Sequence, residues 1–398
     1  MTTSFPCEPS VHDNAPEDRS LQDRSRRRWL QGATTALAGA ALAPHSAWAS
    51  ASASATPAVA AADAASPLRL NLNESSYGPS PRVAKAINDA LGQAPRYVTA
   101  AQATALQRQI AVLEKVEPEQ VILGEVLEAL GQHLAIIQGG GEFVYSVPGY
   151  GALVDAAAPF GGKAVEVPLN AKLENDLAGL SGAIGARTRA LFVVNPHNPS
   201  GTVSAPDAFD AFVREAAQLT LVIVDEAYLD YLDDFDRRTA VRLLREGANV
   251  VVFRTFGKIH ALAGLQIGYA LVPPALATAL RARGVGDAHA LNQLSLAAAS
   301  ASLADPAYTE GVRRQVALER ARWLRFLDTL GRPYAMPAGN FVFFDAGQPQ
   351  QQLAQALAAR GILIARAFPP YANWARISIG TPQENARVQS ALAQLLGR

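Results

Sequence analysis

The sequence predicts an α/β fold in which helices cover both faces of a mostly parallel sheet. Three observations support it: short apolar runs alternate with helical stretches, the runs are continuous rather than alternating, and polar residues follow several of them. Continuous apolar runs are typical of strands that are covered on both faces. Strands that alternate with helices favour a layered domain with a parallel sheet.

The elements follow from these patterns in chain order. The predicted strands of the main sheet are 121–123, 143–145, 164–167, 191–194, 221–224, 250–253 and 268–272. Helical spacing predicts helices at 101–114, 128–137, 206–217 and 382–396. Beyond Pro273 and Pro274 lie a charged helical stretch, 308–329, and short strands at 340–344, 362–365 and 375–379. We therefore expect a second, smaller α+β domain.

The chain is long enough for two domains, each with its own core. We predict a large domain over 96–275 and a small C-terminal domain over 276–398, with the segment 67–95 joining the small domain. The 35 basic and 35 acidic residues balance, so nothing in the composition favours binding to nucleic acid. No metal-binding motif is present, and Cys7 alone cannot form an internal disulfide.

The first part of the chain is read as an export signal. Arg26 and Arg27 precede a modestly apolar run, 32–44, that is too short to span a bilayer stably. Ala47 and Ala49 then supply the small residues of a cleavage site. We expect a twin-arginine signal over 1–49, transport by the twin-arginine translocase, cleavage near Ala49 and a periplasmic product. The Ala/Ser-rich stretch 50–66 is predicted to be a disordered linker.

Polar residues stand just beyond three neighbouring strands. Asn198 lies in Asn-Pro-His-Asn-Pro-Ser-Gly after 191–194, Asp225 follows 221–224, and Lys258 follows 250–253. Ligands of open α/β sheets bind beyond the carboxyl ends of the strands. A lysine amine that attacks an aldehyde, with an acid for a pyridine nitrogen, is the protein's half of pyridoxal phosphate chemistry. Singly these would be a surface lysine, a turn aspartate and a loop; together they favour the functional interpretation.

In this order and spacing, the motifs resemble the fold-type I aminotransferases, and within them the histidinol-phosphate aminotransferase branch. The resemblance runs from about Leu68 to the C-terminus and includes 71–81, Arg96, Tyr97 and 375–381. It implies an aspartate aminotransferase-like, three-layer α/β/α large domain. It also implies pyridoxal 5'-phosphate as cofactor, amino acid and oxo-acid substrates, and a homodimer.

The resemblance assigns five residues to the cofactor. Lys258 would bind its aldehyde and then move the proton at the substrate Cα. Asp225 would pair with the protonated ring nitrogen. Tyr228 and Asn198 would hydrogen-bond the phenolic oxygen, and Tyr150 would stack on the ring.

Five more residues are assigned to the substrate or to the partner subunit. Arg376 matches the arginine that binds the substrate carboxylate as a planar bidentate pair. Asn340 is expected near that carboxylate, and Arg366 and Tyr77 match positions at the distal end of the substrate. Tyr97 matches a tyrosine that reaches the cofactor phosphate of the neighbouring subunit, which would make the enzyme a functional dimer.

The chain departs from the family where the cofactor phosphate is bound. Leu127 stands at the position of a hydroxyl residue, Gly257 in place of a serine before the lysine, and Gln266 in place of an arginine. Glu125 and Glu128 lie nearby and work against anion binding. Three interpretations stay open: weak binding of pyridoxal phosphate, acceptance of an aldehyde without phosphate, or a binding protein with the old fold.

The sequence as a whole predicts an exported, homodimeric, pyridoxal-phosphate-dependent aminotransferase that acts on an amino acid and a 2-oxo acid or related carbonyl. The alternatives are another reaction at Cα (a lyase, decarboxylase or racemase) and a non-catalytic periplasmic binding protein. Histidine biosynthesis is a cytoplasmic pathway, so export does not favour histidinol phosphate as the substrate. The donor, the acceptor and the pathway do not follow from the sequence.

Overall fold

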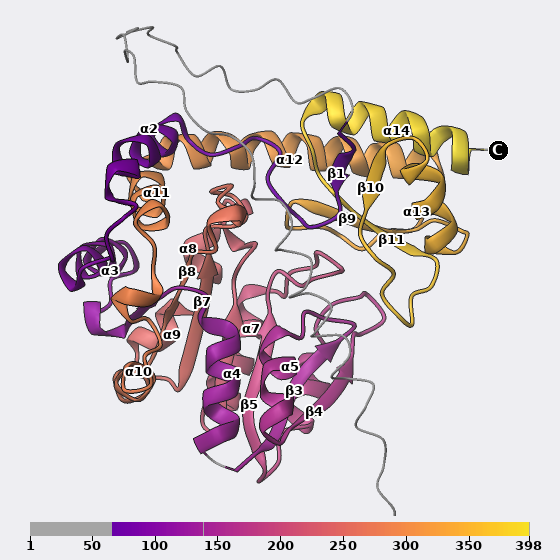
Figure 1. Cartoon of the computed structure of the whole chain (residues 1–398). Helices are drawn as coiled ribbons and strands as arrows, with labels where there is room; N and C mark the ends of the chain where they lie inside the picture. Colours follow the sequence, from indigo (N-terminus) through magenta and orange to yellow (C-terminus); the bar gives the residue numbers. More distant parts are fainter. Residues whose placement is uncertain (1–65, 138, 398) are drawn as a thin grey trace, which may run out of the picture. The chain divides into compact units, whose positions relative to one another are not determined.

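The structure, a computed structural model, describes residues 66–137 and 139–397, and a seven-stranded sheet lies at the centre of these residues (Figure 1). Its strands are β2 (Val121–Leu123), β3 (Gly141–Val147), β4 (Gly162–Pro168), β5 (Thr188–Val194), β6 (Leu221–Asp225), β7 (Val250–Thr255) and β8 (Gly268–Leu271). Their order is β2-β8-β7-β6-β5-β3-β4. β8 runs antiparallel to the other six strands, which share one direction, and this confirms the predicted mostly parallel sheet.

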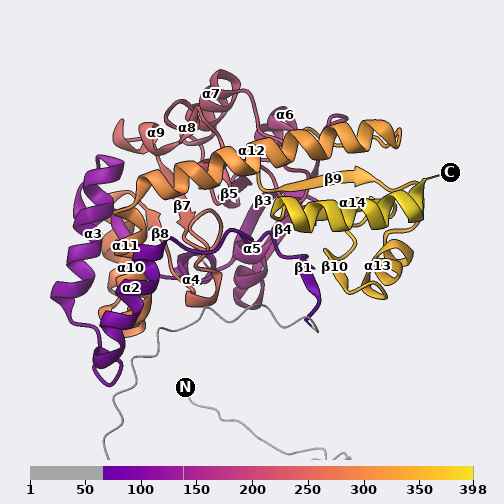
Figure 2. The same ribbon diagram turned by 90° about the horizontal axis from the view of Figure 1, so that it is seen from above.

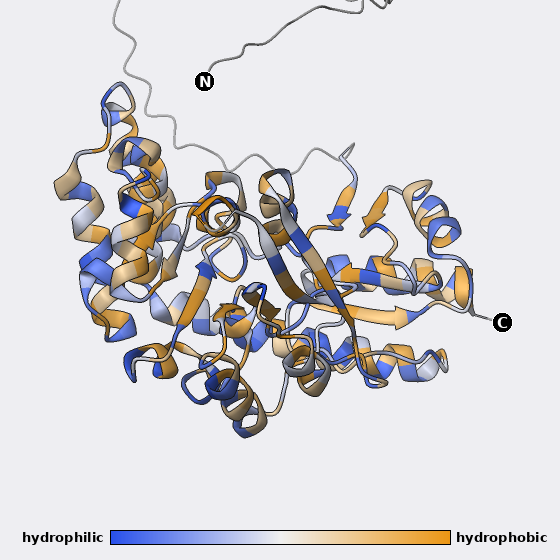
Figure 3. Ribbon diagram, turned by 90° about the horizontal axis from the view of Figure 1, so that it is seen from below, coloured by the Kyte–Doolittle hydropathy of each residue, from blue (hydrophilic) through white to orange (hydrophobic). Residues whose placement is uncertain are grey.

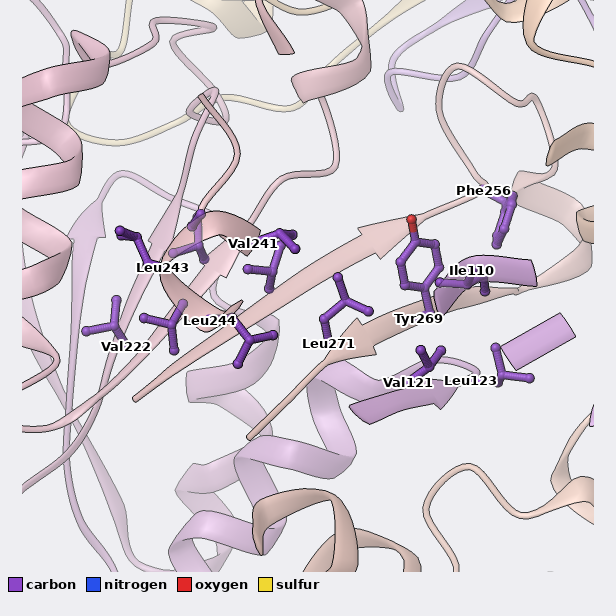
Figure 4. Close-up of a cluster of buried hydrophobic side chains, with 14 of the residues drawn as sticks. Ile110, Val121, Leu123, Val222, Val241, Leu243, Leu244, Phe256, Tyr269 and Leu271 are labelled. Atoms are coloured by element: carbon purple, nitrogen blue, oxygen red, sulfur yellow. The ribbon is translucent and has the colours of Figure 1, made fainter. Parts of the chain in front are cut away.

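Both faces of this sheet are buried, because successive side chains of its central strands enter different cores. Val222 and Val224 of β6 join one core, whereas Ile223 joins the other. Figure 4 shows part of the first core, to which both Val222 and Leu244 belong. Continuous apolar runs are the sequence consequence of two covered faces. The strand β4 differs, since it lies at the edge of the sheet and most of its residues are partly or fully exposed.

Helices from different parts of the chain cover the two faces, which makes the arrangement three-layered as predicted. The first core receives residues from α2 (Pro81–Ala90), α3 (Ala100–Glu114), α7 (Pro206–Ala216), α9 (Val241–Arg245) and α11 (Gln293–Leu303). The second receives residues from α4 (Val126–Ile137), α5 (Ala152–Ala157) and α10 (Pro274–Arg281). The helices carry both hydrophilic and hydrophobic residues along their length (Figure 3), as expected where only one side is buried. Two short helices complete this region, α6 (Leu177–Gly182) and α8 (Phe235–Arg238).

A separate core surrounds two small sheets. One pairs β1 (Leu68–Leu70) with β10 (Ile362–Ile364) in parallel, and the other pairs β9 (Phe341–Asp345) with β11 (Trp374–Ser378) antiparallel. The helices are α12 (Pro306–Thr329), α13 (Gln350–Ala358) and α14 (Pro382–Leu396), and the long α12 packs along α14 (Figure 2). Trp323, Phe341 and Leu392 are fully buried there.

The segments on either side of the predicted domain boundaries pack in both regions. β1 pairs with the small-region strand β10, but Val83 of α2 joins the core of the large sheet, where α2 packs on α11. Ala277 of α10 and Leu296 of α11 also belong to cores of the large sheet. The boundaries at 95/96 and 275/276 stay predictions.

Within the described residues no helix is both long and apolar enough to cross a membrane. The same part of the chain contains no group of three His, Cys, Asp or Glu side chains arranged to hold a metal ion. The predicted signal, 1–49, and the predicted linker up to residue 65 lie outside the described residues.

Candidate active site

A cavity of about 770 Å³ lies at the carboxyl ends of the central strands. Asp225 is the last residue of β6 and is paired in register with Phe253 of β7, and Lys258 follows the end of β7 by three residues. The structure therefore brings together residues that the sequence separates widely. The cavity is lined by seven of the ten predicted site residues: Tyr150, Asn198, Asp225, Tyr228, Lys258, Arg366 and Arg376.

Asp225 is a buried carboxyl group with an unusual affinity for protons. Burial raises its pKa to about 7, although the N–H of Ala227, which donates to Oδ1 at 3.0 Å, and the charge of Lys258 both lower it. Glu226 and Glu128 raise it further. A buried carboxylate without a close cation is suited to pair with a protonated ring nitrogen of a ligand.

Lys258 is half-buried, and its side chain lines the cavity. Nζ donates to the backbone oxygen of Leu72 at 3.2 Å and lies 5.7 Å from the centre of the Tyr228 ring. No carboxylate of the described residues lies within salt-bridge distance of this amine. It is therefore held by weak contacts and is available for a carbonyl compound.

The Tyr228 hydroxyl is held by a residue that lies far away in the sequence and to which the sequence assigned no role. Asn73 Nδ2 donates to the Tyr228 hydroxyl at 3.0 Å, so this hydroxyl keeps its own proton for another acceptor. Asn73 has a positive φ of 56°, a conformation that Asn tolerates better than most residues. Its backbone N–H donates to Ser378 Oγ at 2.9 Å. For this contact of Asn73, the only signal in the sequence was an Asn in a loop between apolar elements.

Asn340 acts on this same segment rather than on the cavity. Its side chain is fully buried and does not line the cavity. Nδ2 donates to the backbone oxygens of Asn73 and Glu74 at 3.1 and 3.2 Å. The structure thus places Asn340 behind the wall that carries Asn73, where it positions the loop.

Asn198 is carried by a loop whose polar groups bond to one another. Asn195 Oδ1 accepts from the Ser204 N–H at 3.1 Å, and His197 Nδ1 lies 3.0 Å from Ser200 Oγ. Burial lowers the pKa of His197 to about 3, so its ring is neutral. The loop is thereby held firmly after β5, and Asn198 faces the cavity.

Arg376 is a buried cation that has no carboxylate partner among the described residues. Nη1 donates to Asn198 Oδ1 and Nη2 to the backbone oxygen of Asn71 at 2.8 Å, while Nε has no partner. Burial lowers its pKa to about 10, and the nearby charge of Arg366 acts in the same direction. The guanidinium carbon lies 5.0 Å from the centre of the Phe368 ring. A desolvated, unneutralised guanidinium is a binding site for a substrate anion.

Tyr150 lines the cavity from the loop before α5 and is 43% exposed. Loss of water around its hydroxyl raises the pKa of the phenol, and Asp225 and Glu128 raise it further. The side chain is therefore neutral at physiological pH and offers a flat, partly accessible ring to a ligand.

A family model for class I and II aminotransferases matches residues 65–392. The chain belongs to this aminotransferase family. A histidinol-phosphate aminotransferase from Limosilactobacillus fermentum is 32% identical over 335 residues, which cover 82% of this chain and 91% of that protein.

Two solved structures extend the likeness to three dimensions. The histidinol-phosphate aminotransferase from Sinorhizobium meliloti, in complex with pyridoxal-5'-phosphate, is 29% identical with a TM-score of 0.72, covering 83% of this chain and 90% of that one. Aspartate aminotransferase from Thermus thermophilus with maleate is 24% identical with a TM-score of 0.72, covering 83% and 91%. The second likeness shows the fold alone, which confirms the aspartate aminotransferase-like architecture.

Besides Asn340, two predicted site residues of this aminotransferase do not line the cavity. Tyr77 packs against the small-region core, and its buried hydroxyl has no partner. Burial, and to a lesser extent the charges of Glu319 and Glu384, raises the pKa of Tyr77 to about 12. Tyr97 is 81% exposed, with its ring 5.5 Å from that of His289. Neither side chain contributes to the cavity of its own chain.

The residues of this aminotransferase fit the ring of pyridoxal phosphate better than its phosphate. Lys258, Asp225 and Tyr228 present an amine, an acid and a hydroxyl to one cavity. Leu127, Gly257 and Gln266, at the positions expected to bind the phosphate, line the same cavity and bring neither a hydroxyl nor a cation. The ring end is therefore complete, and the phosphate end has lost its usual groups.

Proposed function

We propose that this chain is an exported, homodimeric aminotransferase that uses pyridoxal 5'-phosphate to move an amino group between an amino acid and a 2-oxo acid. The family match supports the transaminase activity and its cofactor. The single observation that carries the chemistry is the placement of Lys258 and Asp225 in one cavity with the unneutralised Arg376. This arrangement offers an amine for the aldehyde, an acid for the ring nitrogen and a cation for the substrate carboxylate.

Each side chain has a role that its surroundings support. When bound, the cofactor supplies an aldehyde that captures the amino group and a ring that accepts electrons from Cα. Lys258 holds the aldehyde and afterwards carries the proton to and from Cα. Asp225 keeps the proton on the ring nitrogen, because burial makes its isolated negative charge unfavourable. Tyr228 donates its free hydroxyl proton to the phenolic oxygen.

The substrate would be oriented by a residue from a different part of the fold, since Arg376 lies in β11. Arg376 binds the carboxylate while Asn198 and Asn71 fix the guanidinium plane. A fixed guanidinium plane would set the orientation of the bound substrate, so that Lys258 could take the proton from Cα. The names of the relatives concern histidinol phosphate, whereas we propose a different amino donor for a protein that leaves the cytoplasm.

The export and assembly parts of the proposal rest on other residues. Arg26 and Arg27, the apolar run and Ala49 support twin-arginine export to the periplasm and cleavage near Ala49. The exposed ring of Tyr97, which its own cavity does not use, supports a role in a neighbouring subunit.

Reduction with borohydride tests the catalytic proposal directly. The purified protein is incubated with pyridoxal phosphate, reduced and digested, and the peptides are weighed. We expect the adduct on Lys258 and not on the exposed Lys163, whose replacement by Ala is the matched control. Absence of an adduct at Lys258 in the wild-type protein would refute the proposal.

A further inference from the structure

The charged side chains that line the cavity come from different parts of the fold. Arg366 lies close enough to Arg376 that its charge lowers the pKa of Arg376, and both pack on the Phe368 ring. Glu125 and Glu128 line the cavity from the start of α4, here called its acidic end, and the charge of Glu128 raises the pKa of the Glu125 carboxyl. The charge of Lys258 lowers the pKa of the Glu125 carboxyl.

The acidic end is the part of the cavity that faces the predicted phosphate position. Glu125 and Leu127 line it at the start of α4, together with Gln266 and Gly257. The only cations among the described cavity residues are Lys258, Arg366 and Arg376. Lys258 is committed to the aldehyde, and the two arginines belong to β11 and to the loop after β10. A phosphate dianion in this place would therefore meet two carboxylates and no arginine.

Helix α4 does not make up for the missing cation. The backbone N–H groups and the dipole of a helix N-terminus attract anions. In α4 the first turn already contains Glu128, whose charge satisfies that dipole from within the protein. Partial desolvation raises the pKa of Glu125, and Glu128 raises it too, so added negative charge at this point is unfavourable.

A hydroxymethyl group suits this end better than a phosphate. It is uncharged, and its O–H can donate to a carboxylate or to the side-chain oxygen of Gln266. We propose that the phosphate of the cofactor contributes no net affinity in this cavity, and that the enzyme accepts the unphosphorylated vitamers, pyridoxal and pyridoxamine, in its place. The proposal rests on the proposed function and narrows the chemical class of the ligand.

Binding of the two amine forms measures this without interference from the aldehyde. Pyridoxamine and pyridoxamine 5'-phosphate differ only in the phosphate and form no bond with Lys258. Their Kd values are compared by calorimetry on the full purified chain, freed of bound vitamer by dialysis. We expect the two Kd values to agree within tenfold, or pyridoxamine to bind more tightly. A phosphorylated form that binds tenfold or more tightly overturns the proposal.

Two variants test which residues are responsible. Gln266→Arg restores a cation, and Gln266 already adopts a φ of 48°, so Arg meets no backbone strain that Gln does not. Glu125→Gln removes a charge without changing the shape. Each should tighten pyridoxamine 5'-phosphate by roughly 10-fold or more relative to pyridoxamine, since charge-assisted bonds are the strong ones. An unchanged ratio in both variants overturns the assignment to these residues.

The matched controls carry the same changes on the surface. Glu119→Gln and Gln218→Arg alter exposed residues outside the cavity, and neither should change the ratio of the two Kd values. If neither amine form binds and borohydride leaves no adduct at Lys258, the proposed function itself is wrong. If the adduct forms but the phosphorylated amine binds far more tightly, only the present inference is wrong.

Discussion

Two buried charged residues of the candidate active site lower the stability of the free protein. Asp225 is the clearer of the two, because burial raises its pKa to about 7 and it forms no salt bridge within the described chain. Arg376 is buried with an unpartnered Nε, and burial lowers its pKa to about 10. Both groups are unfavourable in the free protein and favourable once a ligand of opposite charge arrives. That is the pattern expected of binding residues rather than of packing residues.

Asp225→Asn should stabilise the free protein at alkaline pH and abolish transamination. The folded pKa of Asp225 lies above its unfolded value, so the free energy of unfolding falls as pH rises between about 4 and 7. Asn does not ionise, so in the variant the free energy of unfolding does not fall for this reason as pH rises. The variant should be more stable by roughly 2–4 kcal/mol at pH 8, with little difference at pH 4, in urea unfolding without cofactor. A difference that does not depend on pH would contradict the assignment.

Arg376→Gln should weaken substrate binding and leave the cofactor adduct intact. Loss of a bidentate, charge-assisted pair costs about 2–4 kcal/mol, so kcat/KM should fall by roughly 30-fold to 1,000-fold. Absorbance of the Lys258 adduct reports whether the cofactor still binds. Arg214→Gln, which removes an exposed arginine paired with Glu246, serves as the control. An unchanged KM for the oxo acid would place the carboxylate site elsewhere.

At the scale of elements, the apolar runs predict the strands because both sheet faces are buried. Their ends are less predictable, since ladder hydrogen bonds continue onto polar residues. β7 extends to Thr255, and its Arg254 pairs in register with Tyr269 of β8. Arg254 then lies in a buried ionic network with Glu114 and Glu226. Such a network fixes the ends of β6 and β7, which carry Asp225 and lead to Lys258.

Arg254→Met should destabilise the fold strongly, because it leaves Glu114 and Glu226 buried without a cation. Removing one partner from a buried charge network costs about 3–5 kcal/mol. Equilibrium unfolding in urea measures the change. Arg108→Met, an exposed arginine of α3, should alter the free energy of unfolding by less than about 0.5 kcal/mol. A loss of less than 1 kcal/mol for Arg254→Met would show that the network contributes little to stability.

At the scale of the whole molecule, the cavity of one chain lacks a contribution from Tyr97. The exposed ring of this tyrosine lies against His289 and outside the cavity. The proposed dimer gives it a function, since a twofold-symmetric interface would present each Tyr97 to the other subunit. The charges of the full chain balance, so long-range electrostatic steering does not oppose self-association.

Hybrid dimers test the exchange of Tyr97 between subunits. With pyridoxal 5'-phosphate as the cofactor, Tyr97→Ala and Lys258→Ala homodimers should each have little activity, since Tyr97 of the other subunit would be the remaining side-chain donor to the phosphate. When the two variants are mixed and allowed to exchange, one site per hybrid regains both Lys258 and Tyr97, and transaminase activity should reappear. Mixing Lys258→Ala with Lys258→Ala is the blank. Activity that does not recover, although hybrids form, would place Tyr97 in the site of its own chain or outside any site.

Export is tested by the arginine pair. Arg26→Lys with Arg27→Lys keeps the charge but removes the residues that we assign to the twin-arginine signal. The precursor should then stay in the cytoplasm, as fractionation and the retained mass of the leader would reveal. Arg19→Lys, earlier in the same leader, is the control and should be exported normally. Normal export of the double variant would refute the predicted signal.

The sequence alone determined the chemistry that this protein carries and the elements that support it. The types of residue at Lys258 and Asp225, and the replacements at Leu127 and Gln266, are visible in the chain itself. Strand and helix periodicity also follow from local patterns of burial. These features are local, and short windows of sequence are sufficient to predict them.

Only the tertiary structure decided which side chains meet. Asn73 reaches Tyr228 across 155 positions, and Arg376 reaches Asn198 across 178. The same packing leaves Tyr77 outside the cavity. Contacts of this kind depend on how distant elements pack, and a pattern within one element contains no information about the partner that it will meet.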